Sequence, residues 1–74
     1  MFMDIEKVKR IKERYKPDMR VRLLQMDDAQ APEIGTIGTI ILVDDAGIIH
    51  VKWENGSTLG VIFDAGDRIE VIKS

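Results

Sequence analysis

The chain has 74 residues, of which 11 are Lys or Arg and 13 are Asp or Glu, and its net charge is −2. A chain this short forms one domain without two lobes around a cleft, which excludes most ordinary enzyme architectures. It has no cysteine and a single histidine, His50, so a Cys/His zinc site and thiol chemistry are excluded as well. Its 45% hydrophobic content is typical of a folded domain.

The charges are unevenly distributed along the chain. Residues 1–22 carry eight Lys or Arg against four Asp or Glu, for a net charge of +4. Residues 23–74 carry three against nine, for a net charge of −6. Because opposite charges attract, we expect the basic part to be held partly by the acidic part, within one chain or between two chains.

Residues 4–15 are predicted to form a helix. Asp4 is a suitable N-cap, because its carboxylate can accept a hydrogen bond from a free N–H of the first turn. Four apolar residues repeat at about 100° per residue and share one face: Ile5, Val8, Ile11 and Tyr15. Lys16-Pro17 ends the helix, because a residue that precedes proline avoids the α region.

From Arg20 onward apolar and polar residues alternate, which is typical of half-buried strands. Five short strands are predicted, at residues 20–23, 39–43, 49–54, 57–63 and 68–72. Asn55-Gly56 predicts a hairpin with a type I′ turn, in which both central residues have positive φ. The alternation places Trp53 in the core and His50 on the surface, where it is neither a ligand nor a base.

A small sheet must protect its edges, and closure into a barrel does so. We therefore expect a mainly β fold, a small SH3-like five-stranded barrel with one N-terminal α-helix. The helix occupies residues 1–16 and the barrel residues 17–74 of a single domain. A five-stranded oligonucleotide-binding barrel is the alternative. No apolar stretch approaches the roughly 20 residues that span a bilayer, so we expect a cytoplasmic protein without a membrane partner.

Several motifs along residues 15–67 together resemble a small bacterial family catalogued as domain of unknown function 4314. They are Tyr15 with Pro17-Asp18-Met19-Arg20-Val21-Arg22-Leu23, Met26-Asp27 with Ala31-Pro32, Gly35-Thr36-Ile37-Gly38-Thr39-Ile40, Val43-Asp44-Asp45 and Val51-Lys52-Trp53-Glu54-Asn55-Gly56-Ser57. The family usually has glycine at the position of Asp18 and aspartate at that of Glu54. The resemblance implies an SH3-like barrel in bacteria, their phages or mobile elements, and it implies no activity. The region around Trp53-Glu54-Asn55-Gly56 is also similar to small SH3-like domains of eukaryotic ubiquitin ligases, which bind protein segments.

Five basic residues form the candidate partner-binding surface: Lys7, Arg10, Arg14, Arg20 and Arg22. The first three follow one helix side, and the last two share one face of the first strand. Such a surface can contact phosphates, although the sequence pI of about 5.3 and the lack of interleaved aromatic residues disfavour a nucleic-acid binder. A solvated helix side with internal ion pairs is the other interpretation.

Acidic residues gather in the predicted turns: Asp27, Asp28, Asp44, Asp45, Asp64 and Asp67. They match no calcium-loop spacing, and aspartate favours turns for its own hydrogen bonds to the backbone, so we expect no metal site and no cofactor. A small barrel also offers little interior for a catalytic pocket. We therefore expect a non-enzymatic binding module with a protein partner. The alternatives are an accessory nucleic-acid-binding domain that uses the basic helix and first strand, and self-association.

Overall fold

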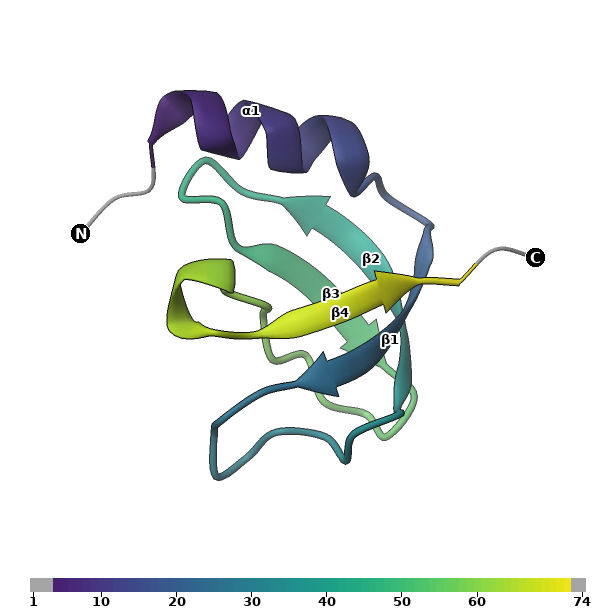
Figure 1. Ribbon diagram of the computed structural model, residues 1–74. Helices are drawn as coiled ribbons and strands as arrows, with labels where there is room; N and C mark the ends of the chain where they lie inside the picture. Colours follow the sequence, from purple (N-terminus) through teal and green to yellow (C-terminus); the bar gives the residue numbers. More distant parts are fainter. Residues whose placement is uncertain (1–3, 73–74) are drawn as a thin grey trace.

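The computed structural model describes residues 4–72, which form an N-terminal helix and one four-stranded antiparallel sheet. The elements are α1 (Ile5–Arg14), β1 (Arg20–Gln25), β2 (Ile37–Val43), β3 (Ile49–Trp53), a 3₁₀ turn (Phe63–Ala65) and β4 (Arg68–Val71). The sheet order is β3-β2-β1-β4, so the last strand pairs with the first, and α1 lies across one end of the curved sheet (Figure 1). The predicted mainly β fold with one N-terminal helix is confirmed.

The helix begins where the sequence predicts. The side chain of Asp4 accepts a hydrogen bond from the N–H of Glu6 at 3.0 Å, as an N-cap does. Val8, Ile11 and Tyr15 are buried, but Ile5 is 81% exposed, so the docked face is shorter than predicted. Ile11 and Tyr15 belong to the core cluster of the sheet, so the end of α1 that leads into β1 anchors the helix.

The core lies on the inner face of the sheet, where the predicted alternation is confirmed. Val21 and Leu23 of β1 are fully buried, and Trp53 of β3 is 1% exposed. Gly38 of β2 pairs with Trp53. A Cβ at Gly38 would lie 2.6 Å from the Trp53 ring and 2.4 Å from a Val51 methyl group, so this glycine makes room for the indole.

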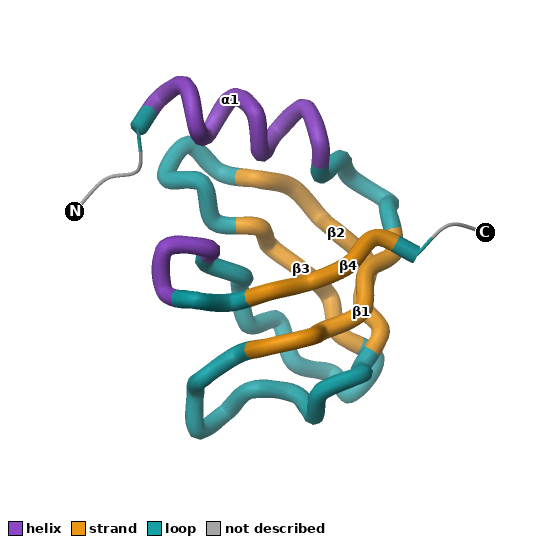
Figure 2. The backbone as a smooth tube through the Cα atoms, viewed as in Figure 1, coloured by secondary structure: helices purple, strands orange, loops and turns teal. Residues whose placement is uncertain are grey.

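The predicted fourth strand, residues 57–63, does not form. Figure 2 shows this stretch as loop and 3₁₀ turn, and only Val61 bridges β3, opposite Ile49. The indole Nε1 of Trp53 donates to the carbonyl oxygen of Leu59 at 2.9 Å, where a regular ladder would use a backbone N–H of β3. The side chain thus replaces the ladder in the middle of the segment, and the five-stranded barrel is not confirmed.

Two turns next to strands of the sheet contain a residue with positive φ, Gly56 after β3 and Asp18 before β1. Gly56 has φ +91°, but Asn55 does not have positive φ, so the turn that follows β3 is not of type I′. Instead the N–H of Gly56 donates to the carbonyl oxygen of Trp53 at 3.0 Å. Asp18, just before β1, has φ +73°, a conformation that glycine adopts freely.

Candidate functional site

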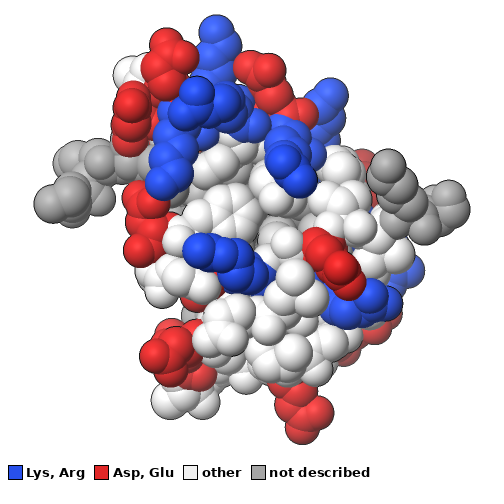
Figure 3. Space-filling view, in the orientation of Figure 1, with Lys and Arg blue, Asp and Glu red and all other residues white. Residues whose placement is uncertain are grey.

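The five predicted basic residues lie in two separate places. Lys7, Arg10 and Arg14 line a hollow of about 290 Å³ between α1 and the 3₁₀ turn, together with Ile11, Tyr15 and Phe63. Arg20 and Arg22 line a different hollow on the outer face of the sheet. Figure 3 shows the Lys and Arg side chains gathered over α1, with acidic side chains among them. The structure therefore places the three helix residues and the two residues of β1 along two different hollows.

Much of the positive charge is paired within the chain. Lys7 contacts Asp64 at 2.5 Å and Lys12 contacts Asp45 at 2.6 Å, so α1 is linked to two of the acidic turns. On β1 the pairs are Arg20–Glu54 at 3.0 Å and Arg22–Glu70 at 2.6 Å. The attraction that the sequence predicts between its basic and acidic parts is thus present within one chain.

Aromatic rings lie beside the helix stripe, although the sequence shows none interleaved with it. The rings of Tyr15 and Phe63 are 5.4 Å apart between centroids, and the Arg14 guanidinium lies 5.7 Å from the Tyr15 centroid. Phe63 reaches the helix only because the 3₁₀ turn folds back against it. Periodicity along the sequence cannot reveal this contact.

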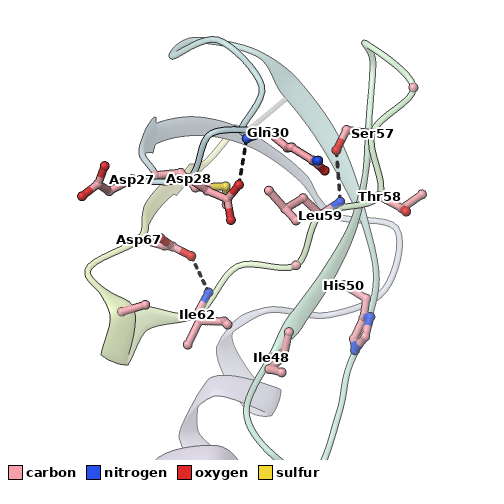
Figure 4. A pocket seen from close by; sticks show the side chains of 14 residues that line it. Asp27, Asp28, Gln30, Ile48, His50, Ser57, Thr58, Leu59, Ile62 and Asp67 are labelled. Carbon is pink, nitrogen blue, oxygen red and sulfur yellow. Dashed lines mark hydrogen bonds between the residues drawn. The ribbon is translucent and has the colours of Figure 1, made fainter.

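Another pocket, of about 630 Å³, lies between the loop that follows β1 and the segment that joins β3 to β4. Figure 4 shows Asp27, Asp28 and Asp67 along one side and Ser57, Thr58 and Leu59 along the other. Among residues 4–72, no Lys or Arg lines it. We call it the acidic pocket, defined by these six residues together with Met26, Gln30, Ile48, His50, Gly56, Gly60, Ile62 and Ala65.

The walls of the acidic pocket are held by specific hydrogen bonds. Asp67 is only 7% exposed, and its Oδ2 accepts from the N–H of Ile62 at 2.8 Å. Asp28 Oδ1 accepts from the N–H of Gln30 at 2.8 Å, which closes a tight turn in the loop. The pocket is therefore shaped before any ligand arrives.

His50 borders the acidic pocket and pairs with Asp44. Its Nε2 lies 2.8 Å from Asp44 Oδ2, while Asp44 Oδ1 accepts from the N–H groups of Ala46 and Ile48, both at 3.0 Å. The hydrogen bond from His50 lowers the pKa of Asp44 below its ordinary value of 3.8, helped by the two backbone donors and opposed by desolvation. This carboxylate thus holds the turn between β2 and β3 as an anion.

The acidic residues of the pocket can be found in the sequence, but their pattern there indicates only that they form turns. That role is real for Asp28, and Asp67 likewise binds the backbone. The missed signal is the charge of two loops far apart along the chain. Residues 23–51 contain no Lys or Arg at all.

Two structural findings limit the chemistry of the described part of the chain. Residues 4–72 contain no group of three or more His, Cys, Asp or Glu placed to hold a metal ion. None of the helices formed by these residues has the length and apolar content needed to cross a membrane.

Comparison with known proteins gives a family. Neither a curated protein nor a solved structure matches the chain significantly. The family described as Domain of unknown function (DUF4314) matches residues 4–72, which include α1 and every strand of the sheet. The chain therefore belongs to the DUF4314 family.

Proposed function

We propose that this protein is a non-enzymatic binding module of SH3-like type and that its partner is a segment of another protein. The order of the chain segments supports the SH3-like type. β4 pairs with β1, and the Ile49–Val61 bridge brings the chain after β3 back beside β3. Five consecutive segments thus follow the order of a small barrel, although the fourth, residues 57–63, forms only one β-bridge.

The acidic pocket is the observation that carries the proposal. Its volume of about 630 Å³ falls within the range of ligand sites. Its walls are loops fixed to a rigid sheet, which is where binding residues are usually found.

Peptide selection followed by NMR tests the proposal. Peptides selected from a displayed random library on the folded domain are titrated into the ¹⁵N-labelled protein. The expected result is a set of shifted amides around the acidic pocket, including Asp28, Thr58 and Gly60. If selected peptides shift no pocket amide, the proposal is wrong.

Nucleic-acid binding is a second candidate, favoured by the hollow beside α1. Positive charge next to aromatic rings is the arrangement with which proteins bind single strands, and Arg10 and Arg14 lie beside Tyr15 and Phe63 there. The ion pairs of Lys7, Arg20 and Arg22 weaken this candidate, since phosphates would compete with carboxylates already in place.

Fluorescence anisotropy with single-stranded DNA and RNA at about 50 mM salt tests the second candidate, because phosphate contacts are strong there. The double variant Arg10→Gln/Arg14→Gln should weaken the binding. Lys52→Gln, an exposed change on β3, is the matched control. Absence of binding by the unmodified protein eliminates this candidate.

A further inference from the structure

One wall of the acidic pocket carries backbone groups without partners. Residues 57–61 run beside β3 in reverse, because the Trp53 N–H donates to the Ser57 carbonyl oxygen at 2.9 Å and Ile49 exchanges two hydrogen bonds with Val61. Between these ends Leu59 uses both of its backbone groups, donating to Ser57 Oγ and accepting from the Trp53 indole.

The backbone groups of Thr58 and Gly60 are in a different situation. In an extended segment, successive residues direct their backbone groups to opposite sides, so Thr58 and Gly60 face away from β3. Within residues 4–72, their N–H and C=O groups make no hydrogen bond. Thr58 is exposed, Gly60 is partly exposed, and both line the pocket. This wall is therefore an open edge to which another extended chain can pair.

The opposite wall supplies uncompensated negative charge. Asp27 and Asp28 are exposed and take part in none of the salt bridges among the described residues. Arg68 is the nearest basic residue along the chain to Asp67, but its guanidinium binds the carbonyl oxygens of Phe63 and Asp67 and does not line the pocket. A partner with positive charge is complementary to this wall.

We infer that the segment bound in the acidic pocket is extended and positively charged, pairs its backbone with Thr58 and Gly60, and places Lys or Arg side chains beside Asp27 and Asp28. This inference rests on the proposed function, because it names the occupant of the same pocket. The two walls have separate tasks: the open edge gives affinity for any extended chain, and the carboxylates select a basic one.

Three synthetic peptides of about ten residues test the inference by NMR titration at low salt. The first alternates Lys and Thr, which favours an extended conformation with all charges on one face. The second alternates Glu and Thr. The third is the Lys-Thr peptide with alternate backbone nitrogens methylated, which removes the donors needed for pairing. Only the first should shift the amides of Thr58 and Gly60, and the shifts should shrink as salt rises.

A double variant that removes the two negative charges tests whether a basic peptide binds because of this pocket or because the whole protein is acidic. Asp27→Asn/Asp28→Asn keeps an acceptor oxygen for the Gln30 N–H, so the loop should keep its fold. It should weaken the Lys-Thr peptide about fivefold, as expected for exposed charge pairs. Glu33→Gln is the matched control, because Glu33 is exposed nearby in the same loop and does not line the pocket.

The outcomes distinguish this inference from the proposed function. Equal weakening by Glu33→Gln, or none by the double variant, overturns the role of Asp27 and Asp28. Undiminished binding of the methylated peptide overturns strand pairing. If peptides selected from a random library shift the pocket amides but carry no positive charge, the inference is wrong and the proposed function stands. If no peptide of any charge shifts these amides, both are wrong.

Discussion

The basic surface on α1 and the acidic pocket carry charges of opposite sign that are used in different ways. Lys7 and Lys12 are paired with Asp64 and Asp45, so part of the positive charge of the helix is consumed in docking it. Asp27 and Asp28 lie in no salt bridge of the described chain and border a hollow. The most conspicuous charge in the sequence is thus partly structural, whereas two less conspicuous carboxylates form no salt bridge among residues 4–72.

The difference shows that a charge run indicates a binding surface only when its counter-charges lie outside the chain. Exposed ion pairs contribute little stability each, but they occupy groups that a ligand would otherwise use. Free carboxylates on a turn contribute little to the fold and keep their full attraction for a cation. Substitutions in the two regions should therefore separate stability from binding.

The largest effect is expected at Trp53, whose indole N–H donates a hydrogen bond to Leu59 in the wall of the acidic pocket. Trp53→Ala should lower the free energy of unfolding by about 3–5 kcal/mol, because it empties a buried site. Trp53→Phe is the sharper probe, since it keeps most of the ring but leaves the Leu59 carbonyl oxygen without its donor.

Trp53→Phe should cost about 1–3 kcal/mol in urea denaturation and shift the amides of residues 57–60 while sparing those of α1. If the amide signals of residues 57–60 do not shift in Trp53→Phe, the indole does not hold this wall of the acidic pocket. The contrast between the acidic pocket and α1 would then lose its structural basis.

The next effect is expected at Asp44, beside the pocket. Asp44→Ala removes acceptors for Ala46, Ile48 and His50 and should lower the free energy of unfolding by about 1–3 kcal/mol. Glu33→Ala is the matched control, because Glu33 is exposed and takes part in none of the salt bridges among residues 4–72. A similar loss in both variants would contradict the assigned role of Asp44.

The lowered pKa of Asp44 also predicts a pH dependence. The ionised Asp44 side chain should contribute fully to the free energy of unfolding at pH values above its ordinary pKa of 3.8. This contribution should disappear as the pH falls through the lower pKa that Asp44 has in the folded protein. Urea denaturation from about pH 7 to about pH 2 measures this, and the difference between the unmodified protein and Asp44→Ala should narrow at the acidic end. A constant difference over this range would contradict the prediction.

A smaller effect is expected from the salt bridges of α1. Lys7→Gln and Lys12→Gln should each lower the free energy of unfolding by about 0.2–1 kcal/mol at low salt, and by less at about 1 M salt. Arg10→Gln is the control, since Arg10 takes part in none of the salt bridges within residues 4–72. If Arg10→Gln destabilises as much as the other two, the pairs do not hold the helix.

The smallest effect on stability is expected from the acidic pocket. Asp27→Asn/Asp28→Asn should change the free energy of unfolding by no more than about 0.5 kcal/mol, because both side chains are exposed and an acceptor oxygen remains. The same urea denaturation measures it. A loss above about 1 kcal/mol would show that these carboxylates stabilise the fold, and the contrast with α1 would fail.

Local sequence patterns predict most of the secondary structure. Asp4 caps the helix, Lys16-Pro17 follows its end, and the alternation of Val21 and Leu23 with Arg20 and Arg22 gives the buried and exposed faces of β1. The segment 57–63 has the same alternation and is nevertheless not a strand. The reason is a tertiary contact, the Trp53 indole bound to Leu59, which no periodicity encodes.

The sequence by itself determined the fold class, the boundaries of α1, the burial of Trp53 and the opposed charges of the two halves. The first three depend on neighbours a few residues apart, and such short-range patterns can be read directly along a chain. The opposed charges follow from counting the charged residues in each part of the sequence. Only the tertiary structure decided which charges are paired, because Lys7 meets Asp64 and Lys12 meets Asp45 across the fold. It also decided where the acidic pocket lies, since its walls come from two loops that approach each other only when the sheet curves.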